Sequence, residues 1–152
     1  MRYVLALLLP LTAACPGRAG DAAAAPAGGT TAPAMDQVTV ELGARPLQGG
    51  DDGGGRVTAE GAAGTIQVRG ALSTPNPCYA LTGSVSRSGS TVTMTVTARS
   101  TGGMCVQSIG AFAYDATVRG LAPGSYTLRV VHTYPDTGWE TRTALESAVT
   151  VR

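Results

Sequence analysis

The sequence contains a single histidine, and its surroundings decide which acid–base chemistry the chain could carry out. His132 lies between Val131 and Thr133, inside a run of residues that favour a β-strand. An imidazole can act as a general base or bind a metal ion, but each role requires partner residues close by. No serine stands in a Gly-x-Ser-x-Gly motif, so the sequence offers no anchor for a nucleophilic triad. We predict that His132 lies at the boundary of the core, with one ring nitrogen hydrogen-bonded and no catalytic role.

A second candidate for chemistry is the tripeptide Asp136-Thr137-Gly138, which is similar to the active-site tripeptide of aspartic peptidases. Those enzymes need two such aspartates that share a proton. The same three residues follow a proline and suit a hairpin turn, which is the structure that we predict for them. A small hydrolase that uses His132 and Asp136 stays as an alternative hypothesis.

Charge and residue types exclude several other functions. The chain has no lysine, which removes Schiff-base chemistry, a pyridoxal cofactor and a lysine-containing phosphate loop. Asp51 and Asp52 lie beside glycines, but the alternating oxygen ligands of a calcium loop are missing. Without Arg2, ten of the eleven basic residues remain and balance the ten acidic ones, so the positive charge that drives nucleic-acid binding is missing. We expect no cofactor, no metal, no nucleic-acid partner and no enzymatic activity.

The first fifteen residues have the three-part pattern of an export signal. Arg2 is followed by an apolar run at residues 3–9 and by small residues that lead to Cys15. The stretch Leu-Thr-Ala-Ala-Cys resembles the lipobox of bacterial lipoproteins, in which the cysteine is acylated and becomes the first mature residue. This resemblance implies a signal peptide at residues 1–14 and an extracytoplasmic protein attached to the bacterial cell envelope through Cys15. An ordinary cleaved signal peptide with an incidental cysteine is the alternative.

The cysteine count agrees with a lipid anchor. The chain has three cysteines, and acylation of Cys15 would leave Cys78 and Cys105 as an even pair. In an oxidising compartment such a pair is expected to form a disulfide. Two separate buried thiols remain the alternative, and a reactive thiol or metal ligand is disfavoured because no histidine or further cysteine lies nearby in the sequence.

Residues 15–36 differ in composition from the rest of the chain. They are mainly alanine, glycine, proline and threonine, with almost no large apolar side chains. Such a segment cannot bury enough surface to offset the entropy cost of ordering it. We predict a lipidated flexible tether at residues 15–36 and one folded domain at residues 37–152.

The predicted domain has the alternating pattern of β-strands throughout. The clearest case is residues 91–98, where Val92, Met94 and Val96 fall on one face and threonines on the other. Similar patterns occur at residues 38–42, 65–68, 79–86, 112–118, 126–130 and 141–151, and turn residues at 87–90 and 135–138 predict two hairpins. We predict an all-β fold, an antiparallel immunoglobulin-like sandwich of about seven to eight strands.

One local motif adds to this fold prediction. Leu121-Ala122-Pro123-Gly124-Ser125-Tyr126 resembles the tyrosine corner of fibronectin type III and related immunoglobulin-like domains. The resemblance implies that Leu121 packs inward and that the Tyr126 hydroxyl bonds to nearby backbone. The spacing between glycine and tyrosine is one residue shorter than in the usual fibronectin form, so the motif leaves the strand order open.

Three predicted loops could meet at one end of such a sandwich. They contain the candidate binding residues Asn76, Pro77, Tyr79, Gly102, Gly103, Asp136 and Trp139. Their order loosely resembles the three inhibitory loops of chagasin-type cysteine-peptidase inhibitors, which are also immunoglobulin-like. Cys78 replaces the threonines of that family's first loop, and Trp139 lacks the preceding Arg-Pro. The alternative, which we favour, is that Trp139 is buried against the disulfide.

From these patterns we expect a lipid-anchored envelope protein that presents a non-catalytic binding or structural module. A protein of the envelope is its expected partner, in addition to the membrane that holds the anchor. A chagasin-like peptidase inhibitor is the second hypothesis, and the small extracytoplasmic hydrolase is the third.

Overall fold

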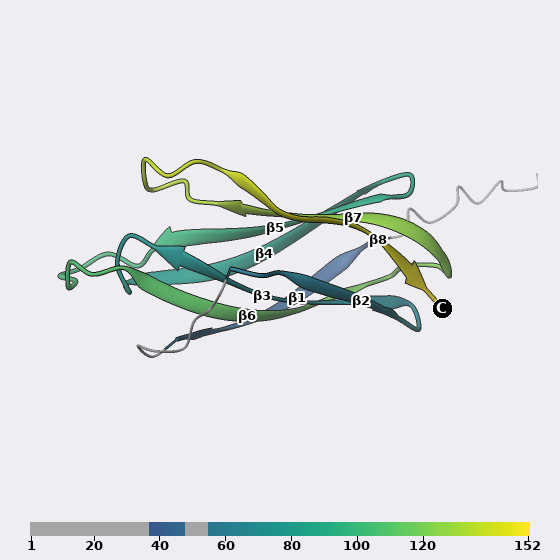
Figure 1. Ribbon diagram of the computed structural model, residues 1–152, viewed down its shortest axis with the longest axis horizontal. Helices are drawn as coiled ribbons and strands as arrows, with labels where there is room; N and C mark the ends of the chain where they lie inside the picture. The colour runs from purple at the N-terminus through teal and green to yellow at the C-terminus, as the bar shows by residue number, and fades with distance from the viewer. Residues whose placement is uncertain (1–36, 48–54) are drawn as a thin grey trace, which may run out of the picture. The chain divides into compact units, whose positions relative to one another are not determined.

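The computed structural model describes residues 37–47 and 55–152 and contains eight strands there. One sheet has the order β1 (Thr39–Pro46), β6 (Gly110–Arg119), β3 (Thr65–Thr74) and β2 (Thr58–Ala62). The other has the order β4 (Tyr79–Ser88), β5 (Thr91–Ser100), β7 (Gly124–Thr133) and β8 (Arg142–Val151). The two sheets pack face to face (Figure 1). The predicted all-β sandwich is confirmed, whereas the predicted signal peptide, Cys15, the tether and Asp51–Asp52 lie outside the described residues.

The alternating pattern of the sequence becomes the two faces of each strand. In β5, Val92, Met94, Val96 and Ala98 are all fully buried, while the threonines between them are only partly covered. Since successive side chains of a strand point to opposite faces, this pattern places one complete face of β5 in the core. The core lies between the sheets and takes apolar side chains from both.

Both predicted hairpins are confirmed. Ser88 and Thr91 are paired across the β4–β5 turn, and Gly89 there has a positive φ of 59°. Glycine adopts this left-handed conformation without the steric cost of a Cβ atom, so a tight two-residue turn is possible. The second hairpin joins β7 to β8 through residues 134–141.

The second sheet is not wholly antiparallel, which differs from the prediction. β5 and β7 are paired in parallel, with Val92 opposite Leu128 and Val96 opposite His132. The chain leaves β5, crosses to the other sheet as β6 and returns as β7, so β7 runs in the direction of β5. The strand order β1-β6-β3-β2 also differs from that of immunoglobulin sheets, although the two-layer architecture is shared.

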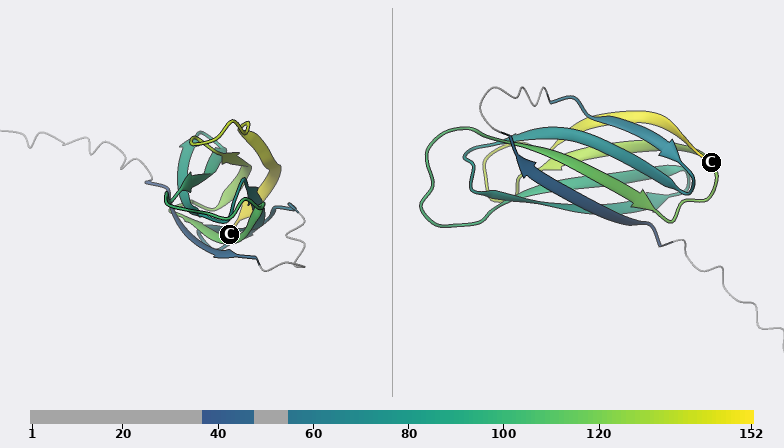
Figure 2. Two further views of the ribbon diagram at one scale, coloured as in Figure 1. Left: turned by 90° about the vertical axis from the view of Figure 1, so that its left-hand side faces the viewer. Right: turned by 90° about the horizontal axis from the view of Figure 1, so that it is seen from below.

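The two ends of the sandwich are built differently (Figure 2). At the closed end lie the C-terminus and the short turns at residues 63–64, 89–90 and 120–123. At the loop end lie the longer connections at residues 75–78, 101–109 and 134–141. The tyrosine corner belongs to the closed end and is confirmed: Leu121 is buried, and the Tyr126 hydroxyl donates to the Ala122 carbonyl at 2.9 Å.

Candidate functional site

The three loops that the sequence suggested as a group do meet at the loop end. A disulfide between Cys78 and Cys105 joins the first loop to the second, with their Cα atoms 6.1 Å apart. The amide of Thr101 also donates to the Cys78 carbonyl at 3.0 Å. The third loop is held by Asp136, whose Oδ2 accepts a hydrogen bond of 3.1 Å from the Ser100 amide. The predicted disulfide is therefore confirmed, and it connects segments that the sandwich brings together.

The residues of the first two loops have mostly structural contacts. Asn76 Oδ1 accepts a hydrogen bond from the Cys78 amide at 3.0 Å, which shapes the loop before the disulfide. Pro77 is exposed, and Gly102 and Gly103 are exposed with φ values of 76° and 85°. Tyr79 was expected to face a ligand but is buried in the core, because it is the first inward-facing residue of β4.

Trp139 is not buried against the disulfide, contrary to our favoured expectation. Its side chain is 39% exposed and packs edge to face on Tyr134, with ring centroids 5.4 Å apart. Tyr134 itself is buried. The indole is thus supported on one side by the buried Tyr134 ring and exposed to solvent on the other.

The second loop presents apolar side chains to solvent. Met104, Val106 and Ile109 have exposed fractions of 104%, 65% and 67%. Together with Trp139, they are the large hydrophobic residues that are exposed in the described part of the chain, and all four belong to loops of the loop end. We call Met104, Val106 and Ile109 the apolar tip. The sequence reasoning missed Val106 and Ile109, although large apolar residues within an expected loop were a usable signal.

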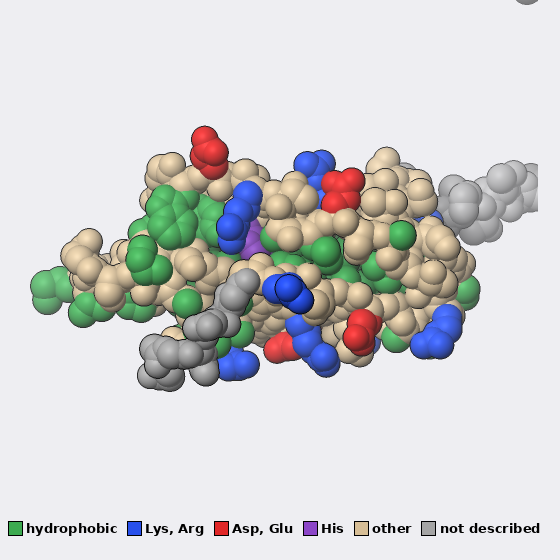
Figure 3. Space-filling view, in the orientation of Figure 1, with side chains coloured by type: hydrophobic (Ala, Val, Ile, Leu, Met, Phe, Trp, Pro, Cys, Tyr) green, Lys and Arg blue, Asp and Glu red, His purple; other side chains and the backbone are tan. Residues whose placement is uncertain are grey.

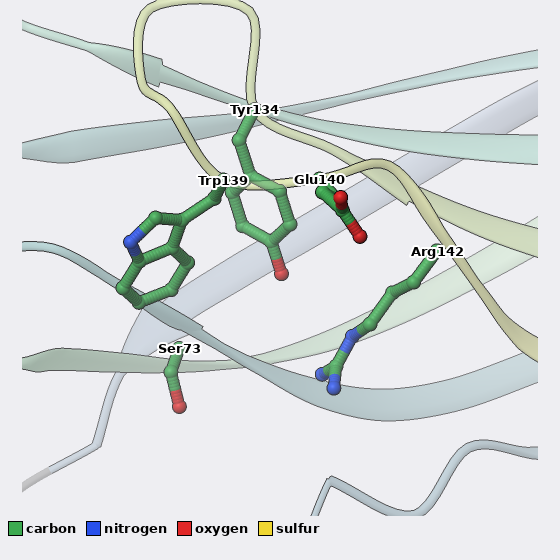
Figure 4. Close-up of a pocket in the computed structure, with 5 residues that line it drawn as sticks. All are labelled: Ser73, Tyr134, Trp139, Glu140 and Arg142. Atoms are coloured by element: carbon green, nitrogen blue, oxygen red, sulfur yellow. The ribbon is translucent and has the colours of Figure 1, made fainter.

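A cavity of about 400 Å³ opens near Trp139 and is lined by Ser73, Tyr134, Trp139, Glu140 and Arg142 (Figure 4). Its position follows from the lengths of the strands. β2 pairs with β3 only as far as Arg69, so no described strand covers that edge of β3 at Ser73. The cavity therefore lies between Ser73, at this uncovered edge, and the β7–β8 loop. Figure 3 shows hydrophobic side chains along the seam between the sheets, with basic and acidic residues on either side.

Arg142 sets the electrostatics of the cavity. Burial raises the pKa of the Tyr134 hydroxyl, while the positive charge of Arg142 and a hydrogen bond with its side chain act in the opposite direction. A raised pKa keeps Tyr134 protonated at neutral pH, so the cavity contains a neutral phenol, a guanidinium and the carboxylate of Glu140. Such a set of groups can orient a polar ligand.

His132 is fully buried, which corrects the expectation of a boundary residue. Its Nε2 lies 2.9 Å from the Tyr114 hydroxyl, so one ring nitrogen is hydrogen-bonded as predicted. Tyr114 reaches across the core over Gly70, where a Cβ atom would lie 2.5 Å from its hydroxyl oxygen. Nδ1 of His132 has no hydrogen-bond partner among the described residues.

Burial, with a smaller contribution from the charge of Arg142, lowers the pKa of His132 to about 4. The imidazole is therefore neutral at physiological pH. Asp136, the other residue of the hydrolase hypothesis, is on the surface, where it accepts from the Ser100 amide and lies 3.9 Å from an Arg99 nitrogen. His132 is thus enclosed in the core, and none of the interactions of the described residues joins it to Asp136.

Residues 37–47 and 55–152 contain no group of three or more histidine, cysteine, aspartate or glutamate side chains placed to hold a metal ion. Within the same ranges, no helix is long and apolar enough to span a membrane.

Comparison with known proteins supports the fold. Residues 66–138 match a family model described as the ORF11 beta-sandwich domain, and this match covers just under half of the chain. It extends from β3 to the β7–β8 loop and includes both cysteines of the disulfide. No curated protein and no solved structure gives a significant match. The chain therefore carries a β-sandwich domain that is similar, over residues 66–138, to the ORF11 beta-sandwich domain.

Proposed function

We propose that this protein is a non-catalytic binding module of the bacterial cell envelope that docks a partner protein at its loop end. The observation that carries the proposal is the apolar tip. Met104, Val106 and Ile109 are exposed on one loop, while the other large apolar residues outside the loop end are at least partly covered. Exposed apolar side chains gathered in one place are typical of surfaces that bind another protein.

The crosslinks of the loop end support this role. The disulfide holds the middle of the 101–109 loop, at Cys105, to the first loop, and the Asp136–Ser100 hydrogen bond ties the end of β5, where this loop begins, to the third loop. A loop that is held before binding loses less conformational entropy when a partner docks. These bonds therefore favour binding by the tip without covering its side chains.

The direction of β1 agrees with presentation of the tip away from an anchor. Thr39 begins β1 opposite Arg119, at the closed end, and Pro46 ends it opposite Phe112, toward the loop end. A tether from Cys15 would thus join the domain at the end opposite the tip. Strands of ten residues span roughly 33 Å, at about 3.3 Å per residue. The tip therefore lies roughly one strand length from Thr39, near which the tether would join the domain.

Photo-crosslinking in native membranes tests the docking role. A photoreactive residue at position 106 is expected to capture one enriched envelope protein, whereas the same probe at Ser125, at the closed end, is not. Val106→Asp is expected to abolish capture by a probe at position 104, and Ala148→Asp, on an exposed face of β8, should preserve it. Recovery of the same proteins from both probe sites would contradict the proposal.

The lipid anchor is a separate part of the proposal and has its own test. Cys15→Ser is expected to move the protein from the membrane fraction to the soluble fraction, because stable attachment depends on the acyl chains. Unchanged partitioning, measured after carbonate washing, would remove the anchor and leave the binding module untouched.

A chagasin-like peptidase inhibitor is the second candidate, because its three loops would have to meet at one end as these loops do. Papain offers a direct measurement. Inhibition by micromolar protein that is lost on substitution of Trp139 or Gly102 would support this function. Papain activity that is unaffected by the protein would eliminate it.

A further inference from the structure

We infer that the cavity beside Trp139 binds a free α-amino acid with an apolar, preferably aromatic, side chain. The cavity has an aromatic wall and a charged wall. Trp139 and Tyr134 form the first, and Glu140 and Arg142 form the second (Figure 4). This site goes beyond the proposed docking role and does not depend on it.

The aromatic wall suits an apolar side chain. The Trp139 indole is 39% exposed, although its other side packs on Tyr134 at a centroid distance of 5.4 Å. A flat apolar group placed against the indole would bury this surface, and aromatic pairs gain additional energy from edge-to-face or offset stacking. An aromatic side chain therefore gains more here than an aliphatic one of similar size.

The charged wall suits a zwitterion. Arg142 has five N–H donors, and its hydrogen bond with the Tyr134 side chain leaves others available for a carboxylate. Among the described residues, neither Arg142 nor Glu140 forms a salt bridge. Glu140 can accept hydrogen bonds from an ammonium group. Arg142 would repel a purely cationic ligand and Glu140 a purely anionic one, so both charges are matched only by a ligand that carries both.

The size of the cavity is consistent with a small ligand. A volume of about 400 Å³ lies near the lower limit for small-molecule sites. The Ser73 hydroxyl, which also lines the cavity, offers a further donor and acceptor.

Titration of the purified full-length chain with L-phenylalanine tests the inference. Trp139 is the only tryptophan in the chain, so its fluorescence reports directly on the cavity. Isothermal calorimetry supplies the affinity independently. Saturable binding is expected, and N-acetylphenylalanine and phenylalaninamide, which each lack one charge, are expected to bind at least about ten-fold more weakly.

Matched variants link the binding to the charged wall. Arg142→Gln and Glu140→Gln are each expected to weaken phenylalanine binding at least about ten-fold. Arg129→Gln and Glu146→Gln are the controls, since these two residues pair with each other on the same hairpin and do not line the cavity. Thermal melting shows whether each variant is folded. Absent binding, equal binding of the two derivatives, or stronger binding of the anionic sugar galacturonate would overturn the inference. None of these results bears on capture of a partner by the apolar tip.

Discussion

The two ends of this sandwich are stabilised by different kinds of interaction. The closed end is held by backbone: the Gly64 amide donates to the Arg152 carbonyl at 3.0 Å, and the Arg152 amide donates to Ala62 at 3.1 Å. The loop end also has such a backbone bond, from Thr101 to Cys78, and is crosslinked in addition by side chains, through the Cys78–Cys105 disulfide and Asp136.

The cores near the two ends also differ. Toward the closed end the inward-facing residues are apolar, as Ile66, Val118 and Leu128 illustrate. The buried polar residues, His132 and Thr74, lie in the part of β7 and β3 that leads to the loop end. The two ends are thus divided: the closed end is compact and apolar, and the loop end combines crosslinks and buried polar residues with the candidate binding surface.

Replacing Cys78 and Cys105 together by serine is expected to lower the free energy of unfolding by about 3.5 kcal/mol, since the crosslink closes a separation of 27 residues. Chemical denaturation measures this loss. Hydrogen exchange should accelerate at the loop end and change little at the closed end. Cys15→Ser serves as the control, and equal acceleration at both ends would contradict the division.

Acidification is expected to destabilise the protein through His132. Its folded pKa of about 4 lies below the usual 6.5, so the unfolded state binds more protons between these pH values. The free energy of unfolding should therefore fall as the pH drops from about 6.5 to 4, by up to about 3 kcal/mol. Urea denaturation across this range measures the slope. His132→Asn, which cannot titrate, should flatten it; an unchanged slope would assign the effect to other groups.

Gly61→Ala is expected to destabilise the closed end by about 1 to 3 kcal/mol. A Cβ atom at Gly61 would overlap the Thr150 carbonyl of β8, and backbone cannot move aside as a flexible side chain can. Gly43→Ala is the matched strand control, because the nearest atom to its added Cβ is the Asp115 carbonyl oxygen at 3.9 Å. Thermal denaturation of both variants measures the difference. Equal stability of the two would show that the closed end is not tightly packed.

Asp136→Ala is expected to cost about 1 kcal/mol, because it removes the hydrogen bond to the Ser100 amide. Arg99→Gln should cost less than about 0.5 kcal/mol, since the 3.9 Å ion pair is exposed to solvent. Denaturant midpoints separate the two effects. A larger loss for the arginine variant would mean that charge pairing, rather than the backbone hydrogen bond, holds the third loop.

The sequence predicted the strands and turns well, but it predicted poorly which side chains are buried. The period-two pattern at residues 91–98 and the turn at Gly89 each depend on a few neighbouring residues, and both predictions were confirmed. Tyr79 and Trp139 were misplaced because Tyr79 is the first residue of β4 and Trp139 lies in the loop before β8. There, burial depends on which distant strand covers the side chain.

The sequence alone therefore determined the β class, the hairpins, the tyrosine corner and the pairing of Cys78 with Cys105. Each follows from side-chain alternation, turn stereochemistry or the number of thiols. Only the tertiary structure decided that β5 and β7 run parallel, that His132 is buried against Tyr114, and that a short β2 leaves a cavity beside Trp139. These features depend on strands that are distant in sequence and are selected by the packing of the whole core, which no local pattern records.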